Sequence, residues 1–92
     1  MKQEVKTSSG FQCEIDKSVL DDMEILDLLL EVEDDPNNSI IYFNRILKKM
    51  MDKETRARLY DHIREDNGRV PVSKFTEEFN EIFKALKDGK KS

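Results

Sequence analysis

The chain has 92 residues and a formal net charge of −4, and 39% of its residues are charged. This length supports a single small domain, which we assign to residues 1–87 and which can bury only a modest core. No apolar run approaches the roughly 20 residues of a membrane span, and the first residues lack the apolar segment of a signal peptide, so we expect a cytoplasmic protein without membrane contact.

The N-terminal region, residues 1–16, is predicted to form a β-hairpin or a single strand. Apolar and polar residues alternate from Phe11 to Ile15, which is typical of a half-buried strand. Residues 8–10 are a turn signal, and residues 5–7 can pair back onto the strand. An isolated hairpin is marginal in water, so the helices must cover its apolar face. Cys13 lies on that face and is predicted to be a core residue and not a nucleophile.

The segment Lys17–Asp35 is predicted to be the central helix, with Ser18 as its N-cap. One apolar stripe consists of Val19, Met23, Leu26 and Leu30. Further apolar residues widen this stripe: Ile25, Leu28, Leu29 and Val32. Only a narrow acidic ridge is left for water: Glu24, Asp27 and Glu31. Because an ordinary surface helix needs an apolar arc of only about 100°, we expect neighbours on more than one side. The alternative is that one apolar flank is left for a partner.

Three further helices are predicted along the rest of the chain. They cover about Ser39–Met51, residues 53–66 and about Ser73–Lys87, and residues 88–92 form a flexible polar tail. The start and stop signals that bound these helices are Pro36, Asp52, Asn67-Gly68 and Ser73.

The predicted fold class is therefore α+β and mostly α. A short N-terminal strand or hairpin is followed by about four helices packed around the first helix, with residues 17–87 helical. The side chains expected in the core are Leu26, Leu30, Phe43, Leu47, Tyr60, Ile63, Phe79 and Phe83.

Charge is distributed unevenly along the chain. Acidic residues dominate from Glu14 to Asp35, and basic residues dominate from Arg45 to Arg58. The simplest interpretation is that the acidic helix packs beside the basic segment of the same molecule. Nucleic-acid binding is disfavoured, because the overall charge has the wrong sign and no aromatic residues lie among the basic ones.

The sequence does not favour catalysis. One histidine and one cysteine are too few for a usual zinc site. Setting Gly68 at the sixth position of a calcium loop would put Ile63 and Lys74 where oxygen ligands are required. His62 lies among charged residues, which is typical of a solvated helix face, and there is no glycine-rich phosphate loop. We predict a protein without enzymatic activity, metal or cofactor, which works by binding.

The binding surface is expected to be apolar surface left over after the core is filled. The helices Ile40–Met51 and Phe75–Leu86 are the expected sites, because Tyr42, Phe75 and the Met50-Met51 pair sit at the edges of their apolar stripes and methionine adapts to varied partners. The candidate partner-binding residues are Leu28, Tyr42, Met50, Met51 and Phe75. For each of them taken alone, the alternative is that it is simply a core residue or an isolated exposed side chain.

Two blocks of the chain have a recognisable order and spacing. The first comprises Gly10-Phe11, Glu14-Ile15-Asp16 and Leu20-Asp21-Asp22-Met23-Glu24. The second comprises residues 61–72, DHIREDNGRVPV, followed by Glu81-Ile82-Phe83. Together, from about Gly10 to Phe83, they resemble the small tail assembly chaperones of long-tailed bacteriophages and prophages of Gram-positive hosts. Met23 departs from the family pattern, in which an aromatic residue is expected, and Asn67 stands where Asp is commoner.

The resemblance implies a protein that acts in the host cytoplasm during tail morphogenesis and is absent from the mature virion. It would bind the long, aggregation-prone tape measure protein and help to recruit tail tube subunits. The resemblance transfers no catalytic residue. It also implies a −1 frameshift near the end of the short product. The codons GGA-AAA-AAG would encode Gly89-Lys90-Lys91 and would contain the heptamer A-AAA-AAG, which is a good site for such a shift. An ordinary lysine tail is the alternative.

A function of a different class is a small regulatory binding protein of a mobile element, such as an anti-repressor that occupies a DNA-binding partner. Gene neighbourhood separates the two, because a chaperone gene should lie between the tail tube gene and a very long tape measure gene. Direct DNA binding would need an affinity that falls steeply with salt. The sequence leaves self-association open.

Overall fold

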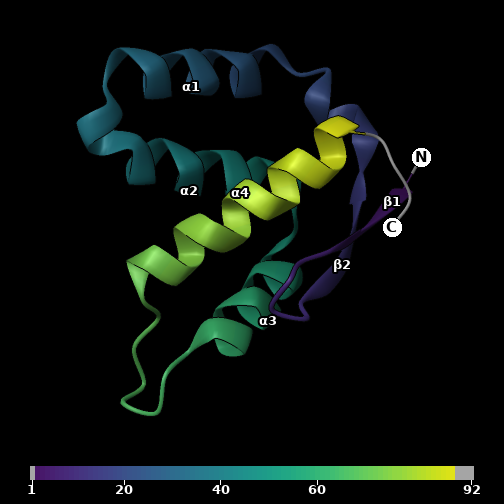
Figure 1. Ribbon diagram of the computed structural model, residues 1–92. Coiled ribbons are helices and arrows are strands. Elements are labelled where there is room, and N and C mark those ends of the chain that lie inside the picture. Colours follow the sequence, from purple (N-terminus) through teal and green to yellow (C-terminus); the bar gives the residue numbers. More distant parts are fainter. Residues whose placement is uncertain (1, 89–92) are drawn as a thin grey trace.

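The computed structural model describes residues 2–88 of the chain (Figure 1). A two-stranded antiparallel hairpin is followed by four helices, so the expected α+β, mostly helical fold is confirmed. The elements are β1 (Lys2–Lys6), β2 (Gln12–Asp16), the short 3-10 helix η1 (Lys17–Leu20), α1 (Met23–Asp34), the short 3-10 helix η2 (Pro36–Asn38), α2 (Ser39–Met50), α3 (Lys53–Ile63) and α4 (Val72–Asp88). No helix within residues 2–88 is long and apolar enough to cross a membrane.

The hairpin presents one apolar face to the helices. Its register pairs Val5 with Cys13, and both side chains are buried. In the connecting turn the N–H of Gly10 donates to the carbonyl of Thr7 at 3.0 Å, and Gly10 has φ +97°, a conformation that favours glycine. The predicted hairpin is therefore present, and its first strand is longer than the expected residues 5–7.

Helix α4, and not the first helix, lies at the centre of the fold. It runs across the middle of the molecule and contacts β1, η1, α2 and α3 (Figure 1). Its buried side chains are Phe75, Glu78, Phe79, Ile82 and Leu86. The ring of Phe79 stacks on that of Phe43 from α2 at a centroid distance of 4.6 Å, and on that of Phe83 at 5.8 Å. The most aromatic stripe of the chain thus joins the other elements into one core.

The first helix is shorter than expected. Helix α1 begins at Met23, and Ser18 is not its N-cap but lies in η1. The side chain of Asp16 accepts a hydrogen bond from the N–H of Ser18 at 3.0 Å, and that of Asp22 accepts one from the N–H of Glu24 at 2.8 Å. These bonds lower the pKa of both aspartates. Each aspartate starts a new helical segment, because such side chains satisfy backbone donors next to a non-helical residue.

The expectation that the first helix is central is wrong. Leu26 and Leu30 are 46% and 50% exposed, and Met23 is 66% exposed. Among the residues of α1 only Ile25 is fully buried. Helix α1 packs mainly against α2 (Figure 1), and a helix with one main neighbour buries only one face. Of the side chains that widened the expected stripe, Ile25, Leu28 and Leu29 pack in or against the core. Of the expected stripe itself, Val19 packs against the core, whereas Met23, Leu26 and Leu30 are exposed.

The remaining helices begin close to their predicted positions. Helix α2 starts at Ser39 as expected. Asp52 caps α3, because its carboxylate accepts a hydrogen bond from the N–H of Thr55 at 2.8 Å. Helix α4 starts directly after Pro71, so Ser73 lies inside its first turn and is not its N-cap.

A loop of residues 64–71 joins α3 to α4. Helix α3 ends at Ile63, earlier than predicted, because Arg64 has extended backbone angles (φ −66°, ψ 138°). Within the loop the N–H of Gly68 donates to the carbonyl of Glu65 at 2.8 Å, and Gly68 has φ +86°. Gly68 therefore serves a turn of the loop and does not end the helix.

The expected core is confirmed in part. Three of its side chains are buried: Leu47, Ile63 and Phe79. Three more are half-buried and pack against the core: Phe43, Tyr60 and Phe83. Leu26 and Leu30 lie outside it. The predicted tail begins within α4 at Asp88, and residues 89–92, including the frameshift site at Gly89-Lys90-Lys91, lie outside the described residues.

The expected pairing of the acidic and basic segments occurs at the start of α1. The ammonium group of Lys49 lies 2.6 Å from Oε1 of Glu24 and 3.4 Å from Oδ2 of Asp22. Its hydrogen bond to Glu24 raises the pKa of Lys49. Within residues 2–88, Lys49 alone makes ion pairs from the basic segment to the acidic one. Most of the acidic surface of α1 is therefore left to solvent.

Two leucine substitutions test which helix face forms the core. Leu47 is fully buried, so Leu47→Ala should lower the free energy of unfolding by about 2–5 kcal/mol. Leu26 is 46% exposed, so Leu26→Ala should change it by less than about 1 kcal/mol. Urea unfolding followed by circular dichroism measures both values. A larger loss for Leu26→Ala than for Leu47→Ala would contradict the structure.

Candidate functional site

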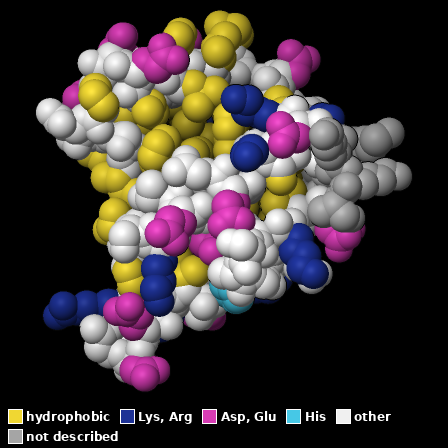
Figure 2. All heavy atoms as spheres, in the orientation of Figure 1, with side chains coloured by type: hydrophobic (Ala, Val, Ile, Leu, Met, Phe, Trp, Pro, Cys, Tyr) yellow, Lys and Arg dark blue, Asp and Glu magenta, His cyan; other side chains and the backbone are white. Residues whose placement is uncertain are grey.

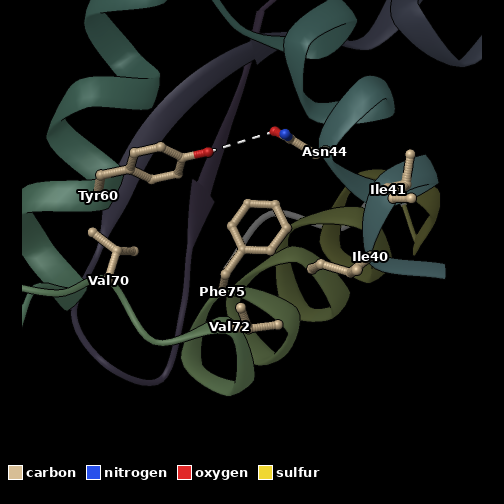
Figure 3. A pocket seen from close by; sticks show the side chains of 7 residues that line it. All are labelled: Ile40, Ile41, Asn44, Tyr60, Val70, Val72 and Phe75. Carbon is tan, nitrogen blue, oxygen red and sulfur yellow. Dashed lines mark hydrogen bonds between the residues drawn. The ribbon is translucent and has the colours of Figure 1, made fainter. Parts of the chain in front are cut away.

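An open apolar pocket of about 320 Å³ lies where α2, α3, α4 and the loop 64–71 meet (Figure 3). The residues that line it are Ile40, Ile41, Asn44, Tyr60, Val70, Val72 and Phe75. Figure 3 shows the rings of Tyr60 and Phe75 and the side chain of Ile40 directed toward the same space. We call this the α2–α4 pocket. Its volume lies at the lower end of the range for ligand pockets, about 300–1,000 Å³.

The rim of the α2–α4 pocket is exposed, and its wall is aromatic. Ile41 and Val72 on the rim are 47% and 61% exposed, whereas Phe75 is 5% exposed. The rings of Phe75 and Tyr60 meet edge to face, with a centroid distance of 6.2 Å. The hydroxyl of Tyr60 donates to Oδ1 of Asn44 at 3.5 Å, which is a long contact. The pocket therefore offers apolar walls and one amide, a composition suited to an apolar side chain of a partner.

The pocket follows from two local features of the sequence. Pro71 separates Val70 from Val72, and its ring forces the chain to enter α4 without a preceding helical turn. Both valines are then held beside the start of the helix. On α2, Ile41 follows Ile40 directly, so it is turned 100° away from it and off the buried stripe.

A second apolar surface lies on α1, on the face turned away from the buried Ile25. It consists of Met23, Leu26 and Leu30, which we call the α1 stripe, and all three side chains are exposed. Figure 2 shows hydrophobic side chains gathered in a hollow between α1 and α4, with acidic side chains along the α1 edge. Isolated exposed leucines are ordinary, but a row of large apolar side chains on one helix face is typical of an interaction surface.

A cluster of polar side chains joins the hairpin turn to α3 and α4. The hydroxyl of Ser9 donates to Oε2 of Glu78 at 2.6 Å and lies 3.0 Å from Nε2 of His62. The same ring nitrogen lies 3.2 Å from the carbonyl oxygen of Ser9. Beside this cluster, the N–H and hydroxyl of Ser8 donate to the carboxylate of Glu81 at 2.7 and 2.8 Å.

This cluster does not have the geometry of a catalytic triad. In a triad the carboxylate orients the histidine and the histidine takes the proton of the serine. Here the carboxyl group of Glu78 and the ring of His62 both meet Ser9, and the proton of Ser9 points to Glu78. The second oxygen of Glu78, Oε1, is buried without a partner within residues 2–88. The arrangement therefore fixes the hairpin turn to the helices.

Cys13 is buried, as its place on the hairpin face predicted. Burial raises the pKa of its thiol to about 11, so the reactive thiolate is scarce at neutral pH. Within residues 2–88, no group of three or more histidine, cysteine, aspartate or glutamate side chains is arranged to hold a metal ion.

The five candidate partner-binding residues are not brought together. Met50, the last residue of α2, and Met51, which follows it, are buried beside the hairpin and α3, so they belong to the core and not to a stripe edge. Tyr42 is half-buried, and its hydroxyl donates to Oδ2 of Asp35 at 3.0 Å, which ties α2 to the end of α1. Leu28 lies in a shallow groove between α1 and α2. Phe75 is the one of the five that lines the α2–α4 pocket.

Sequence reasoning missed most of the exposed apolar residues. The pocket does lie between the two helices expected to bind, but at their N-terminal ends and with contributions from α3 and the loop. Ile41 could have been noticed because it falls outside the stripe of α2, and Val72 because it follows a proline. The residues of the α1 stripe were expected in the core, so the exposed surface of the first helix is its predicted core stripe and not one of its flanks.

Comparison of the chain with protein-family models, with curated proteins and with solved structures gave no match.

Two serine substitutions test the role of the hairpin turn. Ser9→Ala removes the 2.6 Å hydrogen bond and leaves the buried carboxyl group of Glu78 without a donor. The free energy of unfolding should fall by about 1–3 kcal/mol. Ser8→Ala is the matched control, since its hydroxyl bonds to Glu81 at an exposed position, and it should cost clearly less. If the two substitutions lowered the free energy of unfolding equally in urea, the burial of Glu78 would not add to the strength of its hydrogen bond with Ser9.

Proposed function

We propose that the chain is a tail assembly chaperone of a long-tailed bacteriophage or prophage. It binds the tape measure protein in the host cytoplasm and helps to recruit tail tube subunits, and it leaves before the virion is complete. The proposal starts from the resemblance between Gly10 and Phe83 and assigns no catalytic step to the protein.

The observation that carries the proposal is the presence of two exposed apolar surfaces on one small acidic domain. The α2–α4 pocket and the α1 stripe together expose five large apolar side chains: Met23, Leu26, Leu30, Ile41 and Val72. Exposed apolar surface of this kind is costly in solution, and in soluble proteins it commonly marks an interaction site. The net charge of −4 keeps such a protein, and a complex that it forms, soluble.

The geometry suits a client that exposes apolar side chains along a helix. The α2–α4 pocket has room for one apolar side chain beside the rings of Tyr60 and Phe75, and the rim residues Ile41 and Val72 would cover its neighbours on the same helix face. Because the pocket is formed by residues from three helices, its shape is fixed before the client arrives. A long tape measure protein offers many such segments, so several copies can shield it at once.

Substitutions at the pocket rim test the proposal. Ile41→Glu and Val72→Glu place a charge at exposed positions, so circular dichroism should not change. Each should reduce pull-down of the co-expressed tape measure protein by about tenfold or more, because an unpaired charge would be buried on binding. Gln12→Glu is the matched control: it adds the same charge at an exposed position on β2 and should leave recovery unchanged.

Two results would contradict the proposal. Equal recovery of the tape measure protein with all three variants would exclude the pocket as its binding site. Failure of the unaltered chain to bind the tape measure protein, together with capture of a DNA-binding regulator encoded nearby, would favour the anti-repressor function instead.

A further inference from the structure

The α1 stripe is bordered by acidic side chains that form no ion pair with the residues that the structure describes, although Asp27 shares a shallow groove with Arg45 and Lys48 of α2. At 100° per residue, Asp27, Glu31 and Asp34 follow one border of the stripe, and Glu33 lies at the other. All four are exposed. Within residues 2–88 none of them forms an ion pair, whereas Glu24 at the start of the helix is paired with Lys49.

The charges at the end of α1 are locally unfavourable. The last turn contains Glu31, Glu33 and Asp34 and no basic residue. The C-terminal end of a helix carries partial negative charge, so carboxylates there are repelled by the helix dipole as well as by one another. Residues that are unfavourable where they stand are expected mainly at functional sites. Here a partner with positive charge would offset the repulsion among these carboxylates.

We propose that the α1 stripe docks an amphipathic helix whose apolar face is flanked by lysine and arginine. This inference rests on the proposed function for the source of the helix, the tape measure protein, but its chemistry is set by α1. Met23, Leu26 and Leu30 are spaced by three and four residues, which is the seam of a two-helix contact. Basic flanks on the partner meet Asp27, Glu31 and Asp34 on one side and Glu33 on the other.

The charge pattern argues against a second copy of the chain as the occupant. Two α1 stripes placed face to face would bring two acidic borders together and add repulsion to each. A partner with basic flanks instead removes the unfavourable charge at the helix end. The face of α1 that contains Ile25 stays packed inside the molecule, so docking requires no rearrangement of the helix.

Two designed helical peptides test the inference. They share one leucine face and differ only in the flanking residues, which are lysine in one and glutamate in the other. Fluorescence anisotropy at low ionic strength should give an affinity at least about tenfold higher for the lysine peptide, and salt should reduce this difference. Amide chemical-shift changes of the labelled protein should concentrate on residues 23–34.

Variants separate the apolar and charged contributions. The double substitution Leu26→Ser with Leu30→Ser should weaken the lysine peptide by about tenfold or more, because it removes two exposed apolar contacts without touching the core. Glu31→Gln with Asp34→Asn should weaken it less and lower its salt dependence. Ala57→Ser, at an exposed position of α3 outside both apolar surfaces, is the control and should leave the affinity unchanged.

Equal affinity for the two peptides, shift changes centred on the α2–α4 pocket, or no binding of the lysine peptide would overturn the inference. Its failure can be told apart from failure of the proposed function. If the Leu26 and Leu30 variant still captures the tape measure protein, the client docks elsewhere and only this inference falls. If the lysine peptide binds α1 but the tape measure protein does not bind the chain, only the proposed function falls.

Discussion

The fold depends on the packing of one aromatic side chain, Phe79, between α4 and α2. Its ring stacks on Phe43 at 4.6 Å, and Phe75 and Phe83 lie one turn away on either side along α4. A small domain has few apolar side chains with which to form a core, so the helix with the largest ones occupies the centre. The hairpin then lies on one side of α4, where the amide of Gln3 donates to the carbonyl of Ala85 at 3.0 Å.

The position of α4 explains why apolar surface is left over elsewhere. With the centre filled, α1 keeps one main neighbour, α2, and cannot bury Leu26 or Leu30. At the other end of α4, the short link through Pro71 leaves an opening beside Phe75 that no side chain of the described residues fills. Both exposed surfaces thus arise from the same arrangement, and both are accessible without unfolding of the domain.

Local patterns predicted the elements of this fold well, because hairpin alternation, Pro36 and the cap at Asp52 act through neighbouring residues. The sequence could not rank the helices by burial. Lys17–Asp35 has the broadest apolar circumference of the predicted helices. However, the aspartates at 16 and 22 start separate helical segments and so shorten α1, and the large aromatic side chains of α4 place that helix at the centre.

The pocket was missed because it requires α2, α3 and the loop 64–71 to meet, and separate sequence patterns do not specify how these segments pack together. Of the predicted site, Phe75 lines the pocket, whereas Met50 and Met51 are core residues, since only tertiary packing decides which edge of a stripe is covered.

Native-state hydrogen exchange, resolved by residue, tests most directly the claim that α4 is the centre and α1 a peripheral helix. Amides of α4 near Phe79 and Ile82 should exchange only through global unfolding, because these side chains are buried against several elements. Amides of α1 should exchange through local opening, with a lower free energy than that of global unfolding. Equal protection of α1 and α4, or stronger protection of α1, would contradict this account of the fold and of the surfaces that follow from it.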